Sequence, residues 1–128
     1  MGEVRQAARQ QALHADLDRG LDRFFTSIDA AGVADNVIVA TVSEFGRRAQ
    51  ENGSGTDHGA ASVHFMIGSK VKGGRYGKPT TLATLDSRGN LPMAVDFRQM
   101  YATALEGWLD VDAQPILGSG FEPQAVFT

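Results

Sequence analysis

The sequence predicts an α/β fold with a short, mainly parallel sheet flanked by two main helices. Two helical patterns, over residues 13–28 and 97–108, bracket the chain. Between them lies Val37–Val42, an apolar run bounded by polar residues, which is typical of a strand buried on both faces of a parallel sheet. A helix, a turn and a buried strand form half of a βαβ unit. The length of 128 residues predicts one domain, 1–128.

The first helix is predicted by an apolar stripe. Its members lie four, four, three and four residues apart: Leu13, Leu17, Leu21, Phe24 and Ile28. Gly32 is a natural stop for this helix. We expect the stripe to pack on the sheet, and the alternative is a partner-binding helix that leaves the stripe exposed.

The segment between the helices is expected to hold a second strand over 62–68 and a glycine-rich basic loop over 71–79, which we interpret as solvated. Residues 80–85 are either a short strand or irregular. The composition of residues 86–90 predicts a turn.

The second helix begins with a recognisable cap. Asp96 is a predicted N-cap, and Gln99, three residues on, would complete a capping box. We expect the apolar face of this helix to belong to the core. The tail that follows is expected to dock through Ile116, Leu117 and Phe121.

Candidate ligands for a divalent cation follow the predicted buried strand. Glu44 stands at its carboxyl end, where open α/β sheets hold their ligands. A Gly/Ser/Asn-rich loop then ends in Asp57 and His58, and neighbouring residues can share a site only from such irregular backbone. We expect these three side chains to converge on Zn, Mn, Mg or Ca. The alternative is a set of solvated residues, with Glu44 paired to a nearby arginine.

Two further residues have two interpretations each. His64, six residues after His58, is either another metal ligand or a strand histidine whose ring nitrogens are satisfied by backbone. Arg47 either clamps an oxygen of a phosphate or sulfate group or forms a surface ion pair with Glu51.

Composition excludes several classes of protein. A net charge of −3 and a pI near 5.5 argue against a nucleic-acid partner. The chain has no cysteine, hence no disulfide framework or thiolate metal site. No apolar run approaches the roughly 20 residues that span a bilayer, so no membrane partner is expected. The first residues, MGEVRQAARQQ, lack the apolar core of a secretory signal, and the compartment stays open.

Several motifs in order give the chain a resemblance to the C-terminal part of a bacterial family, domain-of-unknown-function family 1501. The motifs are VSEFGRR at 42–48, NGSGTDHG at 52–59, VKGGRYG at 71–77 and VDFRQMYATALEGWLDVD at 95–112. The family is grouped with the alkaline phosphatase and sulfatase superfamily. The resemblance implies a partial alkaline-phosphatase-like sandwich and metal-assisted hydrolysis of phosphate or sulfate esters. It places Glu44, Asp57 and His58 at metal-ligand positions, and it implies export through a twin-arginine signal.

The resemblance also has departures. Superfamily members carry a nucleophile, and similar family members carry an Asp-Thr-His motif before the first helix; this sequence matches neither. We therefore expect a C-terminal portion of a larger hydrolase-like protein that is inactive alone, with the anionic ester bound only by the longer parent. The alternative is a non-catalytic interaction domain whose open sheet edges recruit a partner or a second copy, giving a homo-oligomer.

Overall fold

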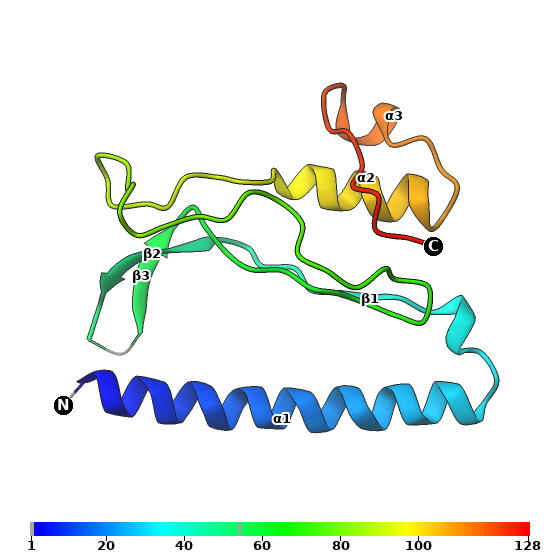
Figure 1. Ribbon diagram of the computed structural model, residues 1–128, viewed down its shortest axis with the longest axis horizontal. Helices are drawn as coiled ribbons and strands as arrows, with labels where there is room; N and C mark the ends of the chain where they lie inside the picture. The colour runs from blue at the N-terminus through cyan, green and yellow to red at the C-terminus, as the bar shows by residue number, and fades with distance from the viewer. Residues whose placement is uncertain (1, 54) are drawn as a thin grey trace. The chain divides into compact units, whose positions relative to one another are not determined.

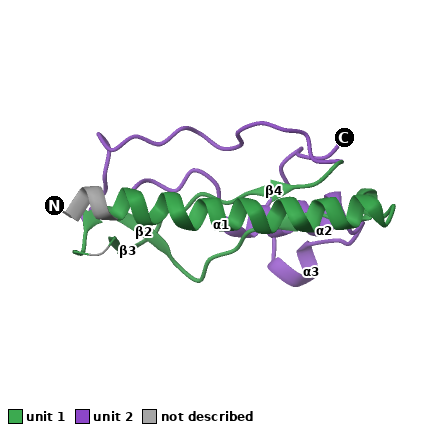
Figure 2. Cartoon of the chain, turned by 90° about the horizontal axis from the view of Figure 1, so that it is seen from below, with its two compact units in different colours: residues 1–69 green, residues 70–128 purple. Residues whose placement is uncertain are grey.

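The computed structural model describes residues 2–53 and 55–128, with side chains from residue 6 onward, and divides into two compact units, 1–69 and 70–128 (Figure 2). The first unit holds the helix α1 (Gly2–Ala30), a short 3₁₀ helix η1 (Ala34–Asn36) and four strands. The strands are β1 (Val39–Ala40), β2 (Gly46–Glu51), β3 (Thr56–Gly59) and β4 (Met66–Ile67). The second unit holds α2 (Phe97–Gly107) and α3 (Gln114–Leu117) (Figure 1).

The prediction of a mainly parallel sheet is wrong. The described strands form two separate two-stranded sheets, β1 with β4 and β2 with β3, and both pairs are antiparallel. Parallel neighbours need a crossover of a dozen or more residues, usually a helix. The described residues between β1 and β4 contain a hairpin and no helix. The chain returns beside itself in the opposite direction, without the helix that usually carries a parallel crossover.

The predicted buried strand is also shorter and more exposed than expected. Of Val37–Val42, only β1 is paired, with Val39 opposite Ile67 and Ala40 opposite Met66. The side chain of Val42 is 64% exposed. The predicted second strand over 62–68 is likewise reduced to β4, and residues 80–85 are irregular.

The first predicted helix is confirmed, although it is longer than its apolar stripe. Gly32, with φ of 70°, ends it in a left-handed turn. The Val33 amide donates to the Ile28 carbonyl at 3.0 Å, and the Gly32 amide donates to the Asp29 carbonyl at 2.9 Å. This pair of bonds is the Schellman pattern, in which glycine satisfies the last carbonyls of a helix. The stop predicted from the sequence is therefore correct.

The stripe of α1 does not pack as expected. Leu13 and Leu17 are each 55% exposed and Phe24 is 42% exposed, while Leu21 and Ile28 are partly covered. None of the described side chains of residues 6–69 is buried. The structure thus matches the alternative of a helix that leaves its apolar face uncovered.

The second unit is organised around α2, and its predicted cap is confirmed. The Asp96 amide donates to the Gln99 side chain at 3.1 Å, and the Asp96 carboxylate accepts from the Arg98 amide at 2.9 Å. Buried Thr103 donates to the Gln99 carbonyl at 2.6 Å and accepts from the Gln124 amide at 2.8 Å. This hydroxyl ties the C-terminal segment to the helix.

The C-terminal segment docks, although not through all of the expected residues. Val126 is buried, and the ring of Phe127 lies 5.7 Å from that of Trp108. The Phe121 ring centre lies 4.0 Å from Cζ of the Arg98 guanidinium, whereas Ile116 is 61% exposed.

The predicted turn at 86–90 is confirmed by the Asp86 amide, which donates to the Asn90 carbonyl at 2.9 Å.

Glycine at position 46 is required by a close backbone approach. A Cβ there would lie 2.4 Å from the Ala61 nitrogen and 2.5 Å from the Ala60 carbonyl carbon. We expect Gly46→Ala to destabilise the β2–β3 hairpin by about 1–3 kcal/mol, because backbone has to move to admit the methyl group. Hydrogen exchange of the Arg47 amide, which donates to the Ala61 carbonyl at 2.7 Å, should accelerate. Gly55→Ala is the matched control, since no atom lies within 4 Å of its Cβ position; equal exchange in both variants would contradict the prediction.

The N-cap of α2 predicts a pH dependence. The Arg98 side chain and amide, both bonded to the Asp96 carboxylate, lower the pKa of Asp96 to about 2 from 3.8. A lowered pKa stabilises the fold above about pH 4, and this stabilisation is lost as the pH falls through about 2. Asp96→Asn keeps a capping oxygen without the charge. We expect wild type to melt above Asp96→Asn at pH 7 and the two to converge near pH 2; a constant difference would contradict this.

Candidate functional site

The β2–β3 hairpin carries most of the candidate site. Gly46 pairs with Gly59, Arg47 with His58 and Glu51 with Thr56. The turn is closed by the Asn52 amide, which donates to the Gly55 carbonyl at 3.0 Å. The segment expected to be an irregular loop is therefore a hairpin turn followed by a strand.

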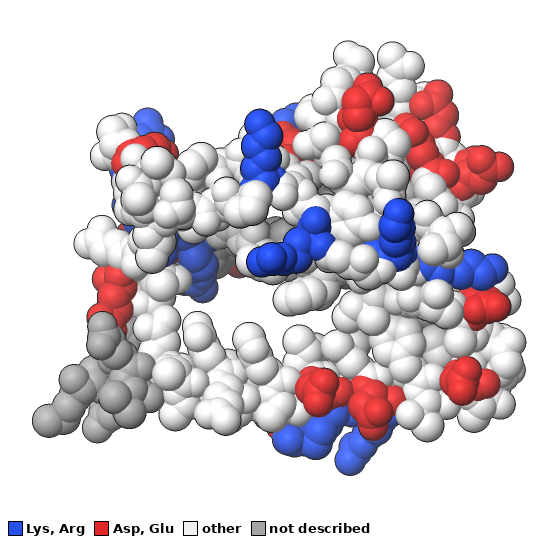
Figure 3. Space-filling view, in the orientation of Figure 1, with Lys and Arg blue, Asp and Glu red and all other residues white. Residues whose placement is uncertain are grey.

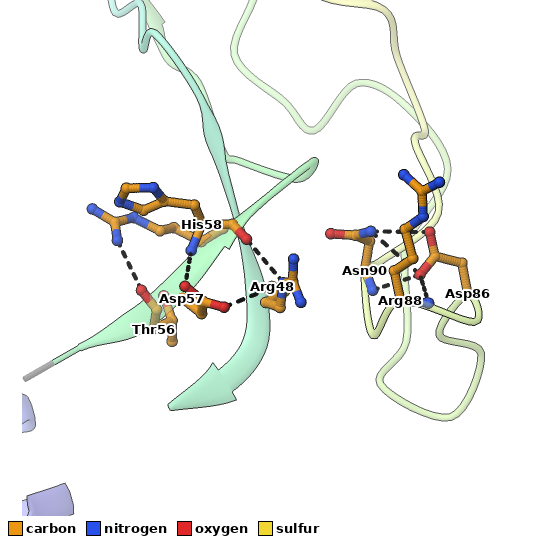
Figure 4. Close-up of polar contacts among 8 residues, drawn as sticks. Arg48, Thr56, Asp57, His58, Asp86, Arg88 and Asn90 are labelled. Atoms are coloured by element: carbon orange, nitrogen blue, oxygen red, sulfur yellow. Dashed lines mark hydrogen bonds and ion pairs between the residues drawn. The ribbon is translucent and has the colours of Figure 1, made fainter. Parts of the chain in front are cut away.

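This correction changes the geometry of the acid–imidazole pair. Asp57 and His58 lie within β3, where successive side chains point to opposite faces. Figure 4 shows the two side chains leaving the strand in different directions. The β2–β3 pairing has a register shift between Arg47 and Glu51, while β3 itself runs as a strand from Thr56 to Gly59.

Asp57 is held by local contacts and stays accessible. One carboxylate oxygen accepts from the His58 amide at 2.9 Å, and the other lies 3.7 Å from Nε of Arg48 (Figure 4). The Asp57 side chain is 46% exposed, so this ion pair contributes little to stability. Arg48 is fixed mainly by donation to the His58 carbonyl at 2.9 Å. The carboxylate retains lone pairs for a further ligand.

The His58 ring packs against Phe45, with centroids 4.1 Å apart and planes inclined by 36°. The Arg47 guanidinium lies 5.0 Å from the centre of the same Phe45 ring. Its Nη1 donates to the Thr56 carbonyl at 2.8 Å. A guanidinium has five N–H donors, so Arg47 keeps donors for an anion beside His58.

Glu44 is not at the end of a buried strand. β1 ends at Ala40, and Glu44 lies in an exposed bend before β2. The neighbouring Ser43 hydroxyl donates to the Phe45 carbonyl at 2.7 Å and shapes this bend. Glu44 is predicted as a ligand because it is expected at the carboxyl end of a buried strand, and the structure does not place it there.

His64 is the most constrained of the candidates. Its Nδ1 lies 3.0 Å from the Thr41 carbonyl oxygen, and its Nε2 lies 2.7 Å from the Ser62 hydroxyl. A carbonyl oxygen can only accept, so Nδ1 carries the proton. In the neutral ring Nε2 is then the acceptor, and Ser62 donates to it. A backbone carbonyl at Nδ1, with the lone pair on Nε2, is also how proteins orient a metal-binding histidine. The geometry thus leaves both interpretations of His64 open.

Sequence reasoning missed Thr41 and Ser62 as the partners of His64. Ser62 is two residues away, and such spacing on extended chain puts side chains on one face, which is a usable signal. Thr41 comes from the opposite side of the antiparallel return. Its amide donates to the Phe65 carbonyl at 3.0 Å, and its hydroxyl accepts from the Phe65 amide at 2.8 Å. Only the fold brings it to the ring.

The candidate ligands are not gathered into one centre. Among the described side chains, those of residues 6–53 and 55–128, no three of His, Asp or Glu lie together as a group that could hold a metal ion. The donors suit a transition metal in type, with imidazole nitrogens and carboxylates, but not in arrangement. The assignments of Glu44, Asp57, His58, His64 and Arg47 as site residues therefore stay predictions.

These features describe a small α-helical and antiparallel-β chain that displays metal-type donors on a hairpin and its flanking strand. The chain belongs to the family described as "Protein of unknown function (DUF1501)", whose model matches residues 4–118. The resemblance inferred from the motifs is confirmed at the level of the family. Searches of curated proteins and of solved structures gave no match. Among the described helices, none combines the length and apolar character needed to cross a bilayer.

Proposed function

We propose that this chain carries part of a divalent-metal site in a phosphate or sulfate ester hydrolase-like protein and does not hydrolyse phosphate or sulfate esters by itself. The observation that carries the proposal is the 3.0 Å contact between Nδ1 of His64 and the Thr41 carbonyl oxygen. This contact favours a proton on Nδ1 and a lone pair on Nε2, which a metal ion could take in place of the Ser62 hydroxyl that lies 2.7 Å away.

The hairpin supplies support of a second kind. Asp57 and His58 are accessible, and Arg47, the cross-strand partner of His58, keeps guanidinium donors on the side of His58. A carboxylate and an imidazole suit Zn or Mn, and a guanidinium suits an anionic ester oxygen. Because no group of three ligands is assembled in the described residues, metal binding is expected to be weak and turnover absent.

Zinc titration by calorimetry tests this proposal. We expect Asp57→Ala and His64→Ala each to weaken binding by about tenfold or more, the scale on which loss of metal-site residues acts. His14→Ala is the matched control, because His14 is exposed on α1. Unchanged zinc affinity in both Asp57→Ala and His64→Ala would contradict the proposed metal site. Metal-dependent hydrolysis of aryl phosphate or sulfate esters, abolished by Asp57→Ala, would show instead that the site is complete.

Self-association is a second candidate function, and a specific observation favours it. The apolar stripe of α1 is open at Leu13, Leu17 and Phe24. Figure 3 shows charged side chains along the front and lower edge of this helix and uncharged ones along its upper edge. An uncovered apolar face with a charged opposite side is typical of an interaction surface. The two-stranded sheets add strand edges that can pair with another chain.

The double variant Leu13→Gln/Leu17→Gln tests this candidate by sedimentation. We expect wild type to form concentration-dependent oligomers and the double variant to shift toward monomer, since the substitutions remove the apolar area that drives association. Ala15→Gln, an exposed position off the stripe, should behave as wild type. A wild-type chain that is monomeric at micromolar concentration would exclude self-association as the function of this face.

A further inference from the structure

The Ser62 hydroxyl, the His64 ring and the Thr41 carbonyl form a chain of contacts beside the β1–β4 pair. Thr41 directly follows β1, and Ser62 and His64 precede β4. The Ser62 hydroxyl is 2.7 Å from Nε2 of His64, and Nδ1 of the same ring is 3.0 Å from the Thr41 carbonyl oxygen. Ser62 is exposed to solvent, and His64 is half-buried. The order is a hydroxyl, a base and a group that orients the base, which is the arrangement that activates a nucleophile.

We propose that Ser62 is an activated nucleophile with His64 as its general base. The Thr41 carbonyl fixes the proton on Nδ1, so Nε2 presents its lone pair to the hydroxyl and can take the proton when Ser62 attacks. Thr41 acts through His64 and is a positioning residue. The chemical class of substrate is an activated ester, such as a small aryl carboxylic ester, because no enclosed pocket is needed to admit it to an exposed serine.

The reaction balances without an added cofactor. Oγ of Ser62 forms a bond to the carbonyl carbon of the ester, and its proton moves to Nε2 of His64. The bond from that carbon to the aryl oxygen breaks, and the departing aryloxide takes the proton from Nε2. Water then attacks the acyl-serine, gives one proton to Nε2, and Oγ leaves with that proton, which restores the starting state and releases a carboxylic acid.

Neighbouring serines lack this arrangement. The Ser43 hydroxyl donates to the Phe45 carbonyl at 2.7 Å, and a carbonyl oxygen cannot accept a proton outright. Ser69 donates to the Asp35 carboxylate at 2.7 Å. A carboxylate is a far weaker base than imidazole. Selective reaction at Ser62 is therefore expected within a protein that carries several exposed serines.

The proposal is independent of the metal site, although both use Nε2 of His64. Zinc on Nε2 would remove the base from Ser62, so the two activities exclude each other at one ring. If zinc does not bind, the metal proposal fails while Ser62 still reacts. If Ser62 does not react and zinc binds through His64, this inference fails while the metal proposal stands.

A fluorophosphonate probe tests the inference on the intact chain. Its phosphorus takes the serine oxygen, fluoride leaves, and Nε2 takes the proton; the label is then located by peptide mass spectrometry. We expect label at Ser62 in the native protein, none at that position in Ser62→Ala, and labelling slowed by about 100-fold in His64→Gln, the scale of general-base assistance. Ser43→Ala is the matched control and should label Ser62 at the wild-type rate.

A measurement on wild type covers the case in which His64→Gln fails to fold. Selectivity for Ser62 should disappear in denaturing urea, because it depends on the fold that holds the ring. Label spread evenly over the serines of the native protein, or selectivity that persists in urea, would overturn the proposal. Unchanged labelling in a folded His64→Gln protein would do the same.

Discussion

The antiparallel return of the chain is the constraint on which the first unit depends. β1 and β4 pair in opposite directions, and the described residues between them hold the β2–β3 hairpin in place of a crossover helix. Thr41 closes this return with two bonds to Phe65, one through its amide and one through its hydroxyl. The same threonine offers its carbonyl to His64. One residue thus links the strand pairing to the chemistry of the imidazole.

The distribution of buried side chains shows which unit of the fold lacks apolar burial. The buried residues among those described all belong to the second unit: Asn90, Ala102, Thr103, Ala113 and Val126. Helices in proteins gain most of their stability from packing an apolar face, and two-stranded sheets are marginal alone. The first unit consists of a long helix with an open stripe and two such sheets. Covering the stripe would supply the apolar burial that the unit lacks.

Both the proposed metal site and the proposed nucleophile depend on His64. The Thr41 carbonyl oxygen, 3.0 Å from Nδ1, favours a proton on that nitrogen, and no substitution of a side chain removes this carbonyl. The nitrogen that remains can accept from Ser62 or bind a metal ion, but not both at once. The hairpin residues Asp57 and His58 lack a comparable constraint, because β3 sends them to opposite faces.

The sequence by itself determined the local features of this protein. The α1 stop at Gly32, the capping box of Asp96 and Gln99, and the turn at 86–90 were all predictable, because each depends on residues within a few positions of one another. Family membership was also carried by the sequence, through motifs in order. Tertiary structure alone decided the direction of strand pairing, since an apolar run has the same composition whether its partner is parallel or antiparallel. It also decided the surroundings of His64, because Thr41 is distant in sequence and only the chain's return sets its carbonyl against the ring.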